Sequence, residues 1–354
     1  MSNPKSHQEN FQRPTRPVEI TAAGMITSVG ANAEMTAASV RSGISAYQES
    51  PILNKDFNPM IMSLVPEDAL PELEDGLKQH ALTSRQQRML RLAAPAIQSL
   101  ADKLDSSVPL MLAGPEKLPG RRSVISDNFL NQLLIQSKVP IDLENSYIFP
   151  YGRAGGFYAL EAAMQLLESG TQGQVIVGGL DSFLDLYLLG TLDRDDRVLA
   201  EGVMDGFAPG EAAAFLLLRL ADDGSGMKVF PPGLADEPGH RYSGQPYKGE
   251  GLANAVTEAL INLQPVAIRT VLASFNGENC NAKEWGVAAI RNHQYLDADF
   301  SIIHPADCYG DIGAATGPVL MALASIGIQK GFYLKPVLVW ASSEMQQRAA
   351  VYMV

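Results

Sequence analysis

YGRAGGFYAL, residues 151–160, is a glycine-rich segment between a strand candidate and a helix candidate. It follows a short strand candidate, 146–149, and leads into an apolar helix that we expect over 154–168. Its glycines allow a tight turn and let the helix pack close against a sheet. The stretch lacks the Gly-Lys-Ser/Thr ending of a nucleotide-binding loop, so we expect a packing role and no bound nucleotide.

The order of strand, turn and helix recurs on both sides of this stretch. Strands alternating with helices predict a mixed or parallel sheet with helices on its faces. Further strand candidates lie at 18–21, 108–113, 174–177, 212–218, 271–275, 300–303, 336–340 and 349–353. Further stretches of helical spacing lie at 33–43, 85–100, 124–136, 249–262, 282–292 and 312–327.

A polar linker that contains glycine, ADDGSG at 221–226, separates two apolar blocks. We therefore expect a first half over 17–222 and a second half over 223–354, which together form a duplicated architecture. Residues 1–16 are polar and show no periodicity, so we expect a flexible N-terminal tail there.

The composition narrows the class of protein. A hydrophobic fraction of 46% is that of an ordinary globular protein, and a formal net charge of −12 argues against binding to nucleic acid or anionic lipid. The two cysteines, Cys280 and Cys308, lie outside any metal-ligand spacing, so no disulfide framework, metal or cofactor is expected. Because no secretory signal or apolar run of ~20 residues is found, we expect a cytoplasmic protein without membrane contact.

Three segments carry a resemblance to a known family. The first is ITAAGMITSVG at 20–30. The second extends from 151 to 211; it contains VGGLDS at 177–182, and DGFAPGEAAA at 205–214 overlaps its end. The third is GDIGAATG at 310–317. In this order they resemble the beta-ketoacyl-ACP synthases, the ketosynthase branch of the thiolase superfamily, over about residues 18–354. The resemblance implies an α/β fold of five layers, αβαβα, made of two similar halves and usually found as a homodimer.

The positions that match the family's catalytic residues carry other side chains. The resemblance places Arg153 where the nucleophilic cysteine stands, and Asn276 and Asp311 where two histidines stand. Ala306 falls where the family has a lysine, and Ser343–Gln347 replaces a glycine turn that helps to form the oxyanion hole. A guanidinium group stays protonated and cannot attack an acyl group. We therefore expect no catalytic residues of the ketosynthase type.

A buried pair between Arg153 and Asp311, joined by Asn276, is expected in the former active site. Such a pair could be a structural plug, or the arginine could receive an anionic group at the helix N-terminus. Glu278 and Asp307 are expected to be solvated loop acids.

The remaining thiols leave a second alternative open. Cys308 stands close to His304 and Asp311, so a relocated nucleophile is conceivable, whereas a histidine that ends an apolar strand is typically structural. Cys280, in the loop of Asn276, could likewise be a relocated nucleophile or a thiol without a catalytic role.

Three functions remain open from the sequence. The first is a non-catalytic scaffold or binding protein, such as an adaptor or chaperone for a secreted effector, because degenerate ketosynthase-like proteins occur in bacterial type VI secretion clusters. The second is the inactive partner subunit of a heterodimeric ketosynthase. The third is a divergent acyltransferase or condensing enzyme that acts on acyl thioesters.

Overall fold

The computed structural model describes residues 13–354 except 122, 127 and 264–265. Most of the predicted tail, residues 1–12, lies outside the described residues. At its end, Arg13 contacts Glu258, and the backbone amide of Thr15 donates to Glu168 over 2.7 Å.

The first half contains a five-stranded sheet in the order β1-β7-β6-β4-β5. Helices α2 and α3 cover one face of this sheet, and α4 packs on the other. The strands are β1 (Val18–Thr27), β4 (Leu110–Ala113), β5 (Tyr147–Phe149), β6 (Val175–Ser182) and β7 (Glu211–Leu220). The helices are α2 (Ser84–Gln98), α3 (Phe129–Ser137) and α4 (Gly155–Glu168).

The second half contains a sheet in the order β10-β9-β11-β12-β8. Helix α6 packs on the outer face with α7 beside it, and α9 packs on the inner face. The strands are β8 (Gly233–Asp236), β9 (Ile268–Ala273), β10 (Leu296–Ile303), β11 (Val337–Ser342) and β12 (Gln347–Met353). The helices are α6 (Glu250–Leu260), α7 (Asn279–Arg291), the short α8 (Ala306–Tyr309) and α9 (Thr316–Gln329).

The two halves repeat one topology. In the first, β5, β4 and β6 are parallel, and β7 and β1 follow as antiparallel neighbours. In the second, β10, β9 and β11 are parallel, and β12 and β8 follow in the same way. Helices α4 and α9 therefore occupy equivalent places in the two halves. In the chain, α4 precedes β6 and α9 precedes β11, and each of these strands is the middle strand of its sheet.

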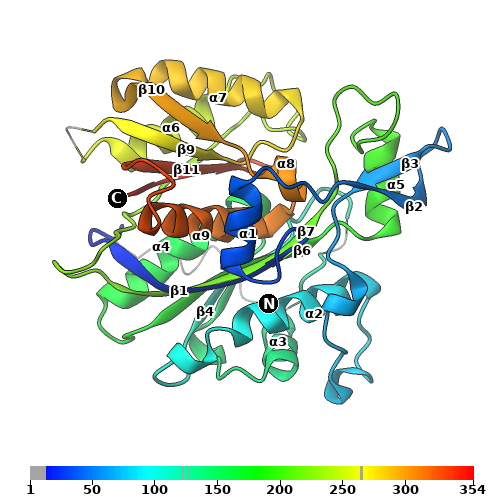
Figure 1. Ribbon diagram of the computed structural model, residues 1–354, viewed down its shortest axis with the longest axis horizontal. Helices are drawn as coiled ribbons and strands as arrows, with labels where there is room; N and C mark the ends of the chain where they lie inside the picture. The colour runs from blue at the N-terminus through cyan, green and yellow to red at the C-terminus, as the bar shows by residue number, and fades with distance from the viewer. Residues whose placement is uncertain (1–12, 122, 127, 264–265) are drawn as a thin grey trace.

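Five layers result, and Figure 1 shows them stacked from α6 and α7 through the two sheets to α2 and α3. Helix α9 lies in the middle layer and contacts strands of both sheets as well as α4. Its residues from Thr316 to Ile328 are all buried, so a helix without a polar face fits this position. The predicted five-layered αβαβα fold of two similar halves is confirmed.

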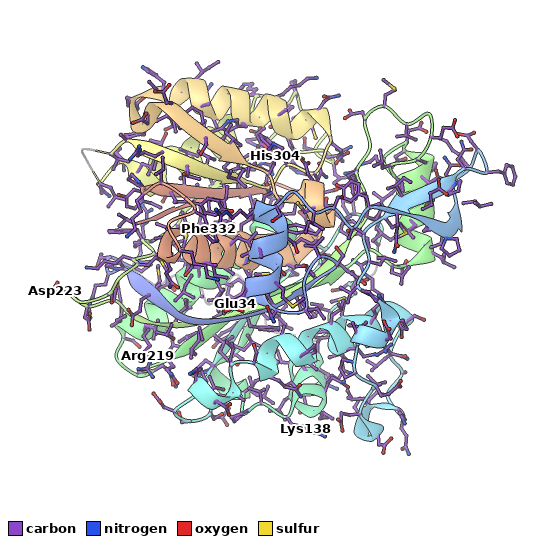
Figure 2. All side chains as sticks on the ribbon, in the orientation of Figure 1. Glu34, Lys138, Arg219, Asp223, His304 and Phe332 are labelled. Atoms are coloured by element: carbon purple, nitrogen blue, oxygen red, sulfur yellow. The ribbon has the colours of Figure 1, made fainter. Side chains whose placement is uncertain are left out.

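The first half carries insertions that the sequence did not predict. A hairpin of β2 (Gln48–Leu53) and β3 (Pro59–Met62) follows α1 (Ala33–Arg41), and α5 (Leu186–Arg194) stands between β6 and β7. Figure 1 shows the hairpin and α5 together, projecting from the five layers. The predicted linker is exposed, and Asp223 within it lies at the edge of the molecule (Figure 2). None of the described helices has both the length and the apolar character needed to cross a membrane.

Candidate functional site

Two equivalent turns bring the predicted site together. Arg153 lies in a single 3-10 turn, Gly152–Ala154, directly before α4, and Asp311 lies just before the corresponding turn, Gly313–Ala315, that leads into α9. Gly152 has a φ of +59°, and a Cβ there would lie 2.7 Å from Oε2 of Glu116. The repeat of the fold thus places the two charged residues opposite each other in the middle layer.

Arg153 and Asp311 form a buried ion pair. Nε of Arg153 lies 3.1 and 3.0 Å from the two carboxylate oxygens, and a terminal nitrogen also donates to Oδ2. Nδ2 of Asn276 donates to the same oxygen over 2.9 Å, and the amide of Gly313 donates to Oδ1 over 2.9 Å. Burial by itself would lower the pKa of Arg153, but the charge of Asp311 outweighs it and raises that pKa, so the guanidinium stays charged.

The pair belongs to a larger charge cluster that the sequence did not predict. Arg197 binds Glu278 through two hydrogen bonds of 2.7 Å and also binds Glu344 over 2.7 and 3.0 Å. We call the set the charge cluster: Arg153, Arg197, Arg241, Asp311, Glu278 and Glu344. Three guanidinium groups therefore face three carboxylates, so the cluster is balanced in charge, as buried ions require.

The acids of the cluster correct one expectation. Glu278 was expected to be a solvated loop acid, yet it is only 6% exposed and is held by Arg197 and Arg241. Burial favours the neutral form of Glu344, but the nearby arginines, Arg197 above all, hold the pKa of this carboxyl well below its usual range. Both acids are thus paired with arginines.

The backbone groups at the start of α4 also have hydrogen-bond partners within the protein. Oγ of Ser343 accepts a hydrogen bond from the amide of Ala154 over 3.0 Å and donates to the carbonyl of Tyr151. Glu116 accepts the amides of Glu344 and Met345 over 3.1 and 2.7 Å. Because the amide of Ala154 already has a partner, it is not free to stabilise an oxyanion.

The remaining predicted residues lie around this cluster without completing a nucleophile. Cys308 is 5% exposed, and burial and then the charge of Asp307 raise the pKa of its thiol. His304 lies on the surface near α8 (Figure 2), where its Nδ1 is 2.7 Å from the carboxylate of Asp307. A thiol that stays protonated is a poor nucleophile, and the histidine is paired with an acid.

Cys280 and Ala306 complete the predicted set. Cys280 is an exposed residue at a polar cavity of about 440 Å³, and its Sγ accepts a hydrogen bond from Arg241 over 3.6 Å. Partial burial of the thiol raises its pKa, and the charge of Glu278 adds to the shift. The carbonyl of Ala306 accepts the hydroxyl of Tyr47 over 2.7 Å. Within the described parts of the chain, no group of three or more His, Cys, Asp or Glu side chains is arranged to hold a metal ion.

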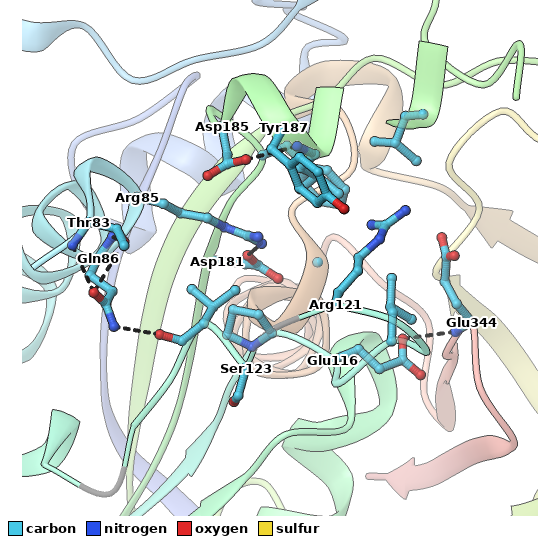
Figure 3. A pocket seen from close by; sticks show the side chains of 18 of the residues that line it. Thr83, Arg85, Gln86, Glu116, Arg121, Ser123, Asp181, Asp185, Tyr187 and Glu344 are labelled. Carbon is cyan, nitrogen blue, oxygen red and sulfur yellow. Dashed lines mark hydrogen bonds and ion pairs between the residues drawn. The ribbon is translucent and has the colours of Figure 1, made fainter. Parts of the chain in front are cut away.

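A larger cavity of about 520 Å³ lies beside the cluster and is lined by Arg153 and Glu344. Figure 3 shows it with Arg85 and Asp181 on one side and Arg121 and Glu116 on the other. Arg85 and Asp181 form an ion pair of 2.7 Å. The sequence did not predict this cavity, because its walls come from segments far apart in the chain.

Comparisons with known proteins place the fold. No family model matches the chain, and no curated protein matches its sequence. The complex of the ketosynthase ApeO with its chain length factor ApeC from Xenorhabdus doucetiae is similar, with a TM-score of 0.76 at 15% identity over 100% of this chain and 99% of that chain. The chain has the ketosynthase fold.

Two further structures share this ketosynthase fold. The ishigamide ketosynthase/chain length factor has a TM-score of 0.72 at 17% identity, over 96% of this chain and 99% of that chain. The ketosynthase from module 6 of the bacillaene synthase of Bacillus subtilis 168 has a TM-score of 0.72 at 12% identity, over 95% of this chain and 72% of that chain. The predicted resemblance to ketosynthases is thus confirmed at the level of the fold.

Proposed function

We propose that this chain is a non-catalytic ketosynthase-like subunit that pairs with a second, catalytic ketosynthase subunit. The charge cluster carries this proposal. Where the resemblance expects a thiol at the helix N-terminus, Arg153 is locked to Asp311, and both former histidine positions belong to the same buried network. Such a network offers no nucleophile for acyl transfer at this position, while the surrounding ketosynthase fold is retained.

The similar structures support pairing with a ketosynthase over the other functions. Two of them are assemblies of a ketosynthase and a chain length factor, and this chain spans 99% of the matched chain in each. The adaptor for a secreted effector has no comparable support and stays a prediction from the sequence. A divergent condensing enzyme lacks comparable support, because Cys308 is buried, which raises the pKa of its thiol, and His304 is paired with Asp307.

An acylation experiment tests whether the chain forms a covalent acyl intermediate. Wild type, Cys308→Ala and Cys280→Ala are incubated with acetyl and malonyl thioesters and examined by intact-mass spectrometry. We expect no acyl adduct on any of the three proteins. An adduct on wild type that one of the two variants lacks would establish a relocated nucleophile and overturn the non-catalytic assignment.

Assembly tests the partner. The tagged chain is purified from its own cells, and its stoichiometric companion is identified by mass spectrometry and sized by light scattering. We expect a 1:1 complex with a ketosynthase-type chain that carries a cysteine at the position of Arg153. A pure homodimer, or a stable complex with a secretion component alone, would contradict the proposal.

A further inference from the structure

An aromatic side chain is exposed at the tip of the hairpin β2–β3, which projects with α5 from the five layers (Figure 1). Phe57, in the turn between the two strands, is 81% exposed. Leu53, the last residue of β2, is 50% exposed. Single apolar side chains are common on protein surfaces, so their exposure alone does not identify a binding site.

The backbone of Phe57 has a conformation that aromatic residues avoid. Its φ is +64°, in the left-handed region that favours glycine and asparagine. The turn is fixed by Asn54, whose carbonyl accepts the amide of Phe57 over 3.0 Å. Oδ1 of Asn54 accepts the amides of Asp56 and Asn58 over 3.0 and 2.8 Å. An asparagine would fit this turn with less strain than phenylalanine, and residues held in strained conformations concentrate at functional sites.

Contacts with α5 and the segment after it hold the hairpin tip in place. The amide of Lys55 donates to Oδ2 of Asp193 over 2.8 Å, and its Nζ lies 2.6 Å from Oδ1 of Asp196. Nδ2 of Asn58 donates to the carbonyl of Glu201 over 3.4 Å. A side chain on a fixed support loses less conformational freedom when it binds a partner. The aromatic ring is therefore preorganised for contact with another molecule.

The charges around the tip indicate what kind of partner fits. Residues 53–58 and 193–201 carry five acids: Asp56, Asp193, Asp195, Asp196 and Glu201. Their bases are Lys55, Arg194 and Arg197, of which Arg197 is buried in the charge cluster. Two such hairpins facing each other would bring like charges together, which disfavours a second copy of this chain. A partner with an excess of Lys and Arg is complementary.

We propose that the hairpin tip is a docking site for a basic segment of another protein, whose Lys or Arg side chains cover Phe57 and Leu53 and face the surrounding carboxylates. The alkyl stems of Lys and Arg cover apolar surface, and their charges are attracted by the face of an aromatic ring. This site is separate from the charge cluster, which carries the proposed function. Either proposal can therefore fail without the other.

Selection from a phage library of random short peptides tests the docking site. The full chain is immobilised, and an excess of Phe57→Asn in solution removes the peptides that bind elsewhere on this acidic protein. Phe57→Asn deletes the ring and suits the left-handed turn, so its fold is retained. We expect enrichment of peptides that combine Lys or Arg with apolar residues. In fluorescence anisotropy, Phe57→Asn should weaken their binding about tenfold or more, as loss of an aromatic anchor does.

Two further variants complete the test. Phe57→Trp keeps an aromatic face and should bind the peptides as wild type does. Ile290→Asn is the matched control, because it replaces an apolar residue of α7 that is 76% exposed, and it should leave binding unchanged. No enrichment, enriched peptides without Lys or Arg, or equal binding to Phe57→Asn would overturn the proposal. Dimerisation of wild type that Phe57→Asn abolishes, measured by light scattering, would assign the tip to a second copy instead.

Discussion

At the scale of the residue, the positions that the resemblance matches to catalytic residues carry side chains that satisfy one another's charges and hydrogen bonds. A buried carboxylate such as Asp311 is tolerated only with partners, and Arg153, Asn276 and the amide of Gly313 supply them. The replacements therefore depend on one another. The arginine needs the aspartate, and replacing either one alone would leave the other buried without its partner.

Arg153→Ala is expected to destabilise the fold by about 3–5 kcal/mol, because it leaves Asp311 buried without its cation. Arg291→Ala breaks an exposed pair and should cost about 0–1 kcal/mol. Urea denaturation followed by circular dichroism measures both. Equal, small losses for the two variants would mean that the buried pair does not stabilise the protein.

Glu116 makes the stability depend on pH. Burial raises its pKa to about 7, from 4.5 as an isolated group, although two backbone amides favour its charge. Between these values the folded protein binds more protons than the unfolded chain, so the free energy of unfolding falls as the pH rises from about 4.5 to 7.

We expect this contribution to reach about 2–3 kcal/mol between pH 5 and pH 8. Glu116→Gln cannot titrate and removes it, so the variant's stability should change less with pH than that of wild type. Urea denaturation at the two pH values measures the difference. Parallel pH profiles for wild type and Glu116→Gln would contradict the raised pKa.

At the scale of the element, the close approach of α4 and α9 sets the geometry of the site. A Cβ on Gly156 of α4 would lie 2.4 Å from Cδ of Pro318 in α9, and one on Gly179 of β6 would lie 2.5 Å from the carbonyl of Ala314. These small residues let the two turns meet. With bulkier residues the helices would separate, and Arg153 would move away from Asp311.

Gly156→Ala is expected to destabilise the protein by about 1–3 kcal/mol, because the added methyl group overpacks this contact. Gly190→Ala is the matched control in α5, where an added Cβ meets nothing within 4 Å. Gly190→Ala should raise the free energy of unfolding by about 0.4–1 kcal/mol, because alanine restricts the backbone of the unfolded chain more than glycine does. Thermal unfolding gives both signs, and stabilisation by Gly156→Ala would refute close packing.

At the scale of the whole molecule, the two halves share one core. Helix α9 of the second half contacts strands of the first sheet, and α4 contacts α9. The charge cluster adds contacts between the halves, from Arg153 to Asp311 and from Arg197 to Glu278. If one half unfolded alone, the surface that the other half buries against it would become exposed to water. We therefore expect the two halves to unfold together.

The chain's own tryptophans test this. Both of them, Trp285 and Trp340, lie in the second half and stack in its core. Their fluorescence reports on that half alone, whereas circular dichroism reports on both. We expect one urea midpoint for the two signals. A fluorescence transition clearly separated from the dichroism transition would mean that the halves are independent units.

Local patterns in the sequence determined the order of the elements. The apolar runs at 212–218 and 312–327 predicted a strand and a helix, and both are present as β7 and α9. The glycine turn at 152–156 was also predicted, because it concerns residues close together in the chain. The hairpin β2–β3 and β8 were missed, since they are short and weakly alternating.

Beyond the predicted pair of Arg153 and Asp311, it is the tertiary structure that determines which charges meet. Arg197 binds Glu278 and Glu344, which are 81 and 147 residues away, and Arg121 reaches the same cavity as Arg85. A charged residue in a polar loop is read as solvated because the sequence does not show what faces it. Burial and pairing come from the packing of distant turns, so the charge cluster and the cavity emerge only when the two halves fold together.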